Sequence, residues 1–103
     1  MVYKLKFTEK YECDFYDIIK YLSQFYPGTP VRFKNELSKK NSILKRMPQM
    51  FKACPYNPMY RQVSVFGYIV FYKIIENPVK IVEIHRILHS ARNIERIIGD
   101  IHD

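Results

Sequence analysis

Three short runs rich in β-branched and aromatic residues constrain the fold of this 103-residue chain more than any other feature. The turn signals Phe66-Gly67 and Glu76-Asn77-Pro78 separate them, and the runs are Tyr60–Ser64, Tyr68–Ile74 and Val79–Leu88. Runs of this length and composition between turn residues are typical of neighbouring antiparallel strands. The sequence therefore predicts a three-stranded meander. Nearly all the polar residues with candidate chemistry lie on it or just beyond its end.

The first half of the chain predicts one strand and two helices. Polar and apolar residues alternate over Val2–Phe7, which is the period of a strand with one buried face. Thr8 is placed to cap a helix that extends to about Phe25, with an apolar stripe at helical spacing. Pro27-Gly28 interrupts it, and Thr29-Pro30 begins a second helix that lasts until Pro48. We expect the two helices to form a hairpin.

The segment between Pro48 and Pro58 contains three prolines and predicts an irregular connection. After the meander, Ser90 is placed to cap a final helix that reaches Ile101 and carries four isoleucines at i, i+3, i+4 and i+7. The predicted order is β-α-α-β-β-β-α. We expect one α+β domain over residues 1–103, with a small antiparallel sheet packed against an N-terminal helical hairpin.

The composition of the chain narrows the classes of molecule that it can bind and its expected location in the cell. The formal net charge is +7 and favours an anionic partner such as RNA, DNA or an acidic protein segment. Cys13 and Cys54 lie outside any paired-cysteine spacing, so we expect two half-buried thiols and neither a metal nor another cofactor. No apolar run approaches the roughly 20 residues that span a bilayer. We expect a cytoplasmic protein without a membrane segment.

Three segments carry a resemblance to a known family. They are Tyr60-Arg61-Gln62-Val63, the central strand Gly67–Tyr72, and the ending Ile84–Ile94. In this order they resemble the RelE/ParE superfamily of bacterial toxins, the toxin halves of type II toxin-antitoxin modules that act in plasmid stabilisation and addiction. The ending, with an Arg on the strand, then His89 and a basic residue before Asn93, is similar to the ParE type.

The resemblance implies two alternative mechanisms. RelE-like members are ribosome-dependent mRNA interferases, which need a base for the 2′-hydroxyl, a cation for the phosphorane and an acid for the leaving oxygen. Their strand Arg after Gly-Tyr is here Ile69, and Gln62 and Ser64 stand where their lysines are expected. ParE-like members are DNA gyrase inhibitors that bind without catalysis. An inactive homologue that serves as a binding module is the third possibility.

The candidate site consists of a base, three cations and a phenol. His89 is the candidate base, Tyr68 the candidate proton donor or stacking ring, and the cations are Arg61, Arg86 and Arg92. Each has an ordinary structural alternative. His89 can hydrogen-bond a turn, and the arginines can form surface ion pairs with Glu83, Glu95 or Asp100. The spacing of His85 and His89 on a strand disfavours zinc.

The resemblance also implies a cognate antitoxin, usually a segment with helices and a strand that wraps the toxin and adds to its sheet. An edge at Val2–Phe7 or at the Arg61 strand would accept such a strand. The isoleucine stripe of the final helix is a further surface that needs a cover. An acidic, amphipathic antitoxin would complement the positive charge.

Overall fold

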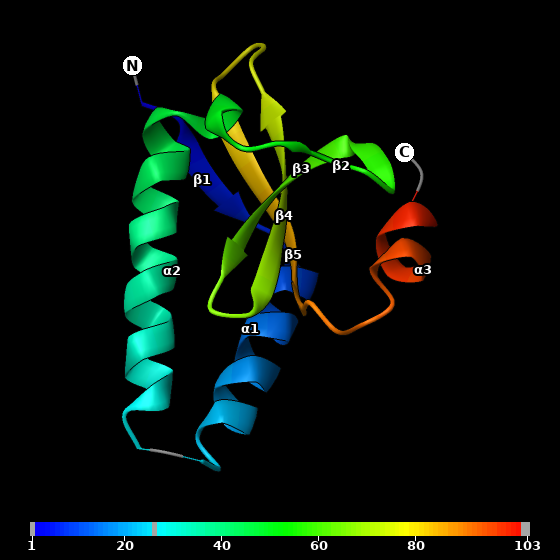
Figure 1. Cartoon of the computed structure of the whole chain (residues 1–103). Helices are drawn as coiled ribbons and strands as arrows, with labels where there is room; N and C mark the ends of the chain where they lie inside the picture. The colour runs from blue at the N-terminus through cyan, green and yellow to red at the C-terminus, as the bar shows by residue number, and fades with distance from the viewer. Residues whose placement is uncertain (1, 26, 102–103) are drawn as a thin grey trace.

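The computed structural model describes residues 2–25 and 27–101 of the chain (Figure 1). A five-stranded sheet forms the body, two long helices cover one of its faces, and a short helix covers part of the other. The elements are, in chain order, β1 (Lys4–Phe7), α1 (Glu9–Leu22), α2 (Thr29–Arg46), the 3-10 turn η1 (Pro48–Met50), β2 (Ala53–Cys54), β3 (Asn57–Val65), β4 (Tyr68–Ile75), β5 (Ile81–His89) and α3 (Ile94–Gly99).

The sheet has the strand order β1-β5-β4-β3-β2. The predicted meander is confirmed, because β3 pairs antiparallel with β4 and β4 pairs antiparallel with β5. The sheet as a whole is mixed, and this corrects the expectation of an antiparallel sheet: β1 pairs parallel with β5. The alternation over residues 2–7 identifies a strand with one buried face, but it carries no information on the direction of the neighbouring strand.

The helical hairpin begins as predicted. The Thr8 hydroxyl accepts a hydrogen bond from the Tyr11 N–H at 3.2 Å and so satisfies one of the unpaired donors of the first turn of α1. The helix is shorter than expected and ends at Leu22, where the Ser23 hydroxyl donates to the Ile19 carbonyl oxygen at 2.7 Å. Figure 1 shows α2 beside α1, along the outer side of the molecule.

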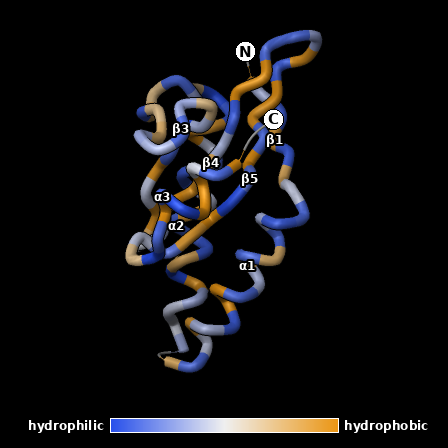
Figure 2. Tube along the Cα trace, turned by 90° about the vertical axis from the view of Figure 1, so that its right-hand side faces the viewer, coloured by the Kyte–Doolittle hydropathy of each residue, from blue (hydrophilic) through white to orange (hydrophobic). Residues whose placement is uncertain are grey.

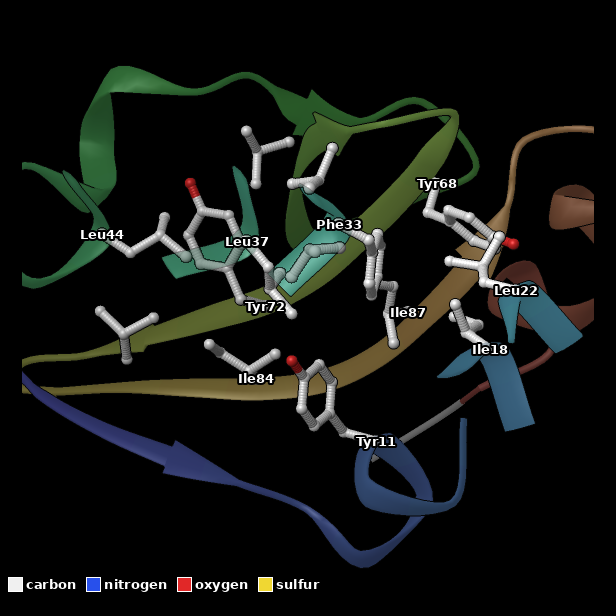
Figure 3. Close-up of a cluster of buried hydrophobic side chains, with 14 of the residues drawn as sticks. Tyr11, Ile18, Leu22, Phe33, Leu37, Leu44, Tyr68, Tyr72, Ile84 and Ile87 are labelled. Atoms are coloured by element: carbon white, nitrogen blue, oxygen red, sulfur yellow. The ribbon is translucent and has the colours of Figure 1, made fainter. Parts of the chain in front are cut away.

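The larger core lies between the sheet and the hairpin. The tube in Figure 2 changes repeatedly between hydrophobic and hydrophilic colours along the strands. The buried side chains on the hairpin side of the sheet pack against α1 and α2. Tyr72 and Phe33 are fully buried there, as the strand period predicts for Tyr72. Figure 3 shows part of this cluster and labels Tyr11, Ile18, Leu22, Phe33, Leu37, Leu44, Tyr68, Tyr72, Ile84 and Ile87.

The final helix starts later than predicted. Its N-cap is Asn93, whose side-chain oxygen accepts from the Arg96 N–H at 3.2 Å, and it extends only from Ile94 to Gly99. Ser90 does not cap it, because β5 continues to His89 and the chain must first turn. The isoleucine stripe is covered by the chain itself: Ile94 and Ile98 are buried against the face of the sheet opposite the hairpin.

The segment between the helices and the meander is more regular than expected. It contains η1 and the two-residue strand β2, which pairs antiparallel with β3. The two thiols also differ from the prediction of half-burial, since Cys13 is exposed on α1 whereas Cys54 is buried under α3. None of the helices in residues 2–25 and 27–101 has the length and apolar character needed to cross a membrane.

Candidate functional site

A pocket of about 500 Å³ lies between α1 and the end of the β4–β5 pair. Three of the five predicted site residues line it: Tyr68 from β4, His89 from the end of β5 and Arg92 from the following turn. The antiparallel register places Tyr68 directly opposite His89 and so brings these two together. The remaining lining residues are Asp14, Asp17, Ile18, Tyr21, Ile87, Leu88 and Ala91.

His89 and Tyr68 form an edge-to-face pair. Their ring centroids lie 5.2 Å apart and their planes are almost perpendicular, at 89°. His89 Nδ1 accepts a hydrogen bond from the Ala91 N–H at 3.0 Å, so in the neutral ring the proton is on Nε2. Burial, and to a lesser degree the neighbouring Tyr21, raises the pKa of Tyr68 above the ordinary value of a phenol, so its hydroxyl gives up its proton less readily.

Arg86 is held by an acidic residue that the sequence analysis did not single out. Its Nε donates to Asp14 Oδ2 at 2.7 Å and its Nη2 donates to Asp14 Oδ1 at 2.9 Å. Asp14 Oδ2 also accepts from the backbone N–H of Ile87 at 3.2 Å. The hydrogen bond to Asp14 raises the pKa of Arg86 further, against the opposing effect of burial, so the guanidinium is a permanent, paired cation.

Arg61 lies apart from the other four candidates. Its Nη1 donates to the carbonyl oxygens of Phe51 at 2.6 Å and Gln49 at 3.3 Å, which ties β3 to the segment after α2. It therefore holds backbone and does not line the pocket. Among the described residues neither Arg61 nor Arg86 forms an ion pair with Glu83, Glu95 or Asp100.

The α1 wall of the pocket is the part that sequence reasoning missed. Asp14, Asp17 and Tyr21 follow one another at i, i+3 and i+7, so they project from one side of α1. This spacing interleaves with the apolar stripe of the helix. It could have indicated a polar strip beside the core, but not that β5 would lie against it.

His85 has a separate set of partners on the sheet. Its Nδ1 lies 3.1 Å from the Tyr60 hydroxyl, and its Nε2 lies 2.5 Å from Glu83 Oε1. In the neutral ring, Nε2–H therefore donates to the carboxylate and Nδ1 accepts from the phenol. Within the described ranges there is no group of three His, Cys, Asp or Glu side chains arranged to hold a metal ion.

The fold and sequence place the chain in a known class, that of the RelE/ParE superfamily toxins. Residues 5–94 match the model of the family described as the ParE toxin of the type II toxin-antitoxin system parDE. The chain therefore belongs to the ParE toxin family. No curated protein has a significant sequence match to it.

Two solved structures have the same fold. A chain of the chromosomal ParDE toxin-antitoxin system from P. aeruginosa superposes with a TM-score of 0.69 at 16% identity, over 84% of this chain and 95% of that one. A chain of the toxin-antitoxin complex RelBE2 from Mycobacterium tuberculosis superposes with a TM-score of 0.57 at 18% identity, over 86% of this chain and 99% of that one. Identities this low establish the architecture alone.

Proposed function

We propose that this toxin arrests growth by binding an essential target and not by cutting mRNA, with DNA gyrase as the target that the ParE resemblance implies. Both candidate targets, gyrase and the ribosome, are cytoplasmic, and so is the proposed site of action. The proposal rests on the observation that two of the three candidate cations already have partners within the protein. Arg86 is paired at two points with Asp14, and Arg61 is committed to backbone carbonyls elsewhere.

RNA cleavage would need more than the pocket offers. Of the proposed set, only His89, Tyr68 and Arg92 line it. The carboxylate of Asp17 lines the same pocket and repels a phosphate that Arg92 would have to hold, whereas the charge of Asp14 is compensated by Arg86. A cleavage site must stabilise the extra negative charge of the phosphorane, and of the three candidate cations only Arg92 lines this pocket.

The strand position of the nuclease Arg has another role in this chain. Ile69 packs beside the cluster under α3, and together with Gln62 of β3 and Arg92 it lines a second depression next to the start of α3. An apolar residue there contributes contact area and no charge. This supports a surface that binds a protein, since interfaces combine an apolar and aromatic centre with polar groups at the rim.

We further propose that a cognate antitoxin neutralises the chain at β1. This strand forms one edge of the sheet. Just before it the Tyr3 N–H donates to the Lys45 carbonyl oxygen at 2.7 Å, so an added strand would pair with the outer backbone groups from Leu5 onward. Beside it, Val2 and Phe7 are 63% and 39% exposed, and Lys4 and Lys45 line the same depression. This arrangement suits an extended acidic segment with apolar side chains. The stripe of α3 is not available to it, because Ile94 and Ile98 are already buried.

The test separates cleavage from binding. The purified chain, from a preparation shown to arrest growth when expressed alone, is added to ribosomes programmed with a defined mRNA. We expect no cuts in codon register, and the His89→Ala/Arg92→Ala variant should give the same uncut pattern.

Codon-register cuts that disappear in this variant would overturn the proposal and make the pocket a nuclease site. A chain that does not arrest growth at any expression level would identify an inactive homologue. Binding of the product of a neighbouring small acidic reading frame, weakened by Phe7→Asp, would support the antitoxin surface. A monomeric chain that binds no such product would contradict it.

A further inference from the structure

Helix α2 carries much of the positive charge of the molecule. Residues 29–46 contain six lysines and arginines and one carboxylate, Glu36. The neighbouring helix α1 has the opposite balance, with four carboxylates and two lysines. Because α2 runs along the outer side of the molecule, its outward face meets solvent along its length (Figure 1). The charge is therefore concentrated on one exposed side of the hairpin.

The outward face of α2 has a regular pattern. Phe33, Leu37 and Leu44 are buried against the core. On the opposite side, five exposed or partly exposed polar residues recur at alternating steps of three and four, and we call them the α2 stripe: Arg32, Asn35, Lys39, Ser42 and Arg46. The three cations are seven residues apart, which places successive cations about 10.5 Å apart along the axis.

One end of the stripe is fixed by a contact with the β3–β4 turn. The guanidinium of Arg32 lies 5.5 Å from the ring centroid of Phe66, which itself packs edge-on against buried Phe33. Phe66 has a left-handed backbone with φ of 54°, followed by Gly67 at 82°, the pattern of a tight hairpin turn. A bulky residue is unfavourable in this conformation, and here the turn presents its ring to Arg32.

Beside this contact the surface is hollowed. A depression of about 410 Å³ is lined by Arg32, Asn35, Glu36, Lys39 and Phe66. Lys39 Nζ donates to Glu36 Oε1 at 3.2 Å, an exposed pair between neighbouring turns that contributes little to stability. The lysine can therefore exchange this partner for another anion at small cost. The depression offers a ligand two cations and an amide, beside the carboxylate of Glu36.

We propose that the α2 stripe binds the phosphate backbone of duplex DNA. The stripe is polar and carries three cations, with exposed Val31 and Phe66 beside it and not within it. Interfaces with nucleic acid are polar and strongly positive, whereas protein interfaces have an apolar or aromatic centre. Its cations are spaced by about 10.5 Å, close to the roughly 12 Å width of the major groove of B-DNA, so neighbouring cations can reach phosphates on either side of it. Asn35 and Ser42 supply hydrogen bonds between them.

This inference goes beyond the proposed function and does not depend on it, because the contact is measured without gyrase. It describes binding to phosphates, so it predicts no base specificity. If the toxin also acts on gyrase, the stripe would let it hold the DNA that the enzyme is handling. A failure of one assay leaves the other interpretable.

The experiment measures the binding of the full chain to a fluorescent 20-base-pair duplex by anisotropy over a range of salt concentrations. The variant Lys39→Gln/Arg46→Gln removes two cations of the α2 stripe and keeps good helix formers. Lys10→Gln/Lys20→Gln removes two exposed cations of α1 and is the matched control, since the net charge changes equally. Circular dichroism melts show that both variants fold.

We expect the stripe variant to bind about tenfold more weakly at fixed salt and to lower the slope of log affinity against log salt by about two. The control variant should change the affinity and the salt slope much less. Equal losses in the two variants would overturn the proposal, since net charge alone would then account for binding. It is also overturned if the stripe variant loses affinity for an acidic peptide but keeps its affinity for the duplex.

Discussion

Asp14 and Arg86, 72 residues apart in the sequence, form a two-point ion pair that joins the first helix to the last strand. Asp14 also receives the backbone N–H of Ile87. Beyond Ile84, β5 is no longer paired with β1, and the start of α1 lies beside it instead. There the hydroxyl of Thr8, the N-cap of α1, donates to the His85 carbonyl oxygen at 2.8 Å. The pair therefore closes the sheet edge and removes Arg86 from the pocket chemistry.

Removing the carboxylate should destabilise the fold. Both side chains are mostly buried, with exposed fractions of 17% for Arg86 and 13% for Asp14, so Asp14→Ala leaves a guanidinium and an N–H without their acceptor. We expect a loss of about 2–3 kcal/mol in the free energy of unfolding, measured by urea denaturation. The double variant Asp14→Ala/Arg86→Ala should lose less than the sum of the single variants. Strict additivity would contradict the pair.

Arg61 is predicted to matter for stability and not for toxicity. Arg61→Met removes the donors to the Phe51 and Gln49 carbonyls and should cost about 1–2 kcal/mol in the free energy of unfolding. Growth arrest per folded molecule should remain. A variant that is fully stable but no longer toxic would return Arg61 to the functional site.

The cap of α3 gives a local test. Asn93→Ala should lower the free energy of unfolding by about 1 kcal/mol, because the Arg96 N–H loses its acceptor. Ser90→Ala is the matched control and should have little effect, since Ser90 lies in the turn before the helix. If Ser90→Ala lowers the melting temperature more than Asn93→Ala does, the helix starts after Ser90, as the sequence alone predicts.

Alkaline pH should destabilise the protein through two buried phenols. Burial raises the pKa of Tyr11 and of Tyr72 to about 12, with nearby Asp14 adding to the first effect and Arg61 opposing the second. Their unfolded values are near 10, so the unfolded state releases protons first. The stabilisation is complete below pH 10 and is lost as the pH rises through 12.

The check is the urea midpoint between pH 9 and 11.5. Tyr11→Phe should flatten the decline, whereas Tyr16→Phe, at a position that is 65% exposed, should not. Tyr72→Phe should flatten it as well and also lose the hydrogen bond from its hydroxyl to the Pro48 carbonyl oxygen, 2.7 Å long. An unchanged decline in all three variants would assign the alkaline transition to other groups.

Local signals in the sequence predict the first strand, the three helices and the meander in their correct order, but they miss η1 and β2. The Thr8 cap and the Phe66-Gly67 turn act through neighbours within a few residues, and both are present. The predicted start of α3 was wrong because Ser90 and Asn93 are both good N-cap residues, and only the length of β5 decides between them. The parallel β1–β5 pair depends on how the chain crosses the sheet, which alternation does not encode.

The candidate site was predictable only in part. Tyr68 and His89 face each other through strand register, so two strands and a turn of known length bring them together. The sequence alone could not identify the partner of Arg86, because α1 contains four carboxylates and no local feature selects Asp14. The resemblance to the family gave the toxin class, whereas the placement of the cations required the three-dimensional structure.

The most direct test of the central claim is gyrase supercoiling in the presence of the purified toxin. We predict that the wild-type chain inhibits supercoiling and causes relaxed or cleaved plasmid to accumulate, and that His89→Gln/Arg92→Gln, which alters the pocket, greatly reduces this effect. Unimpaired supercoiling by a preparation that arrests growth, together with codon-register cuts on programmed ribosomes, would contradict it.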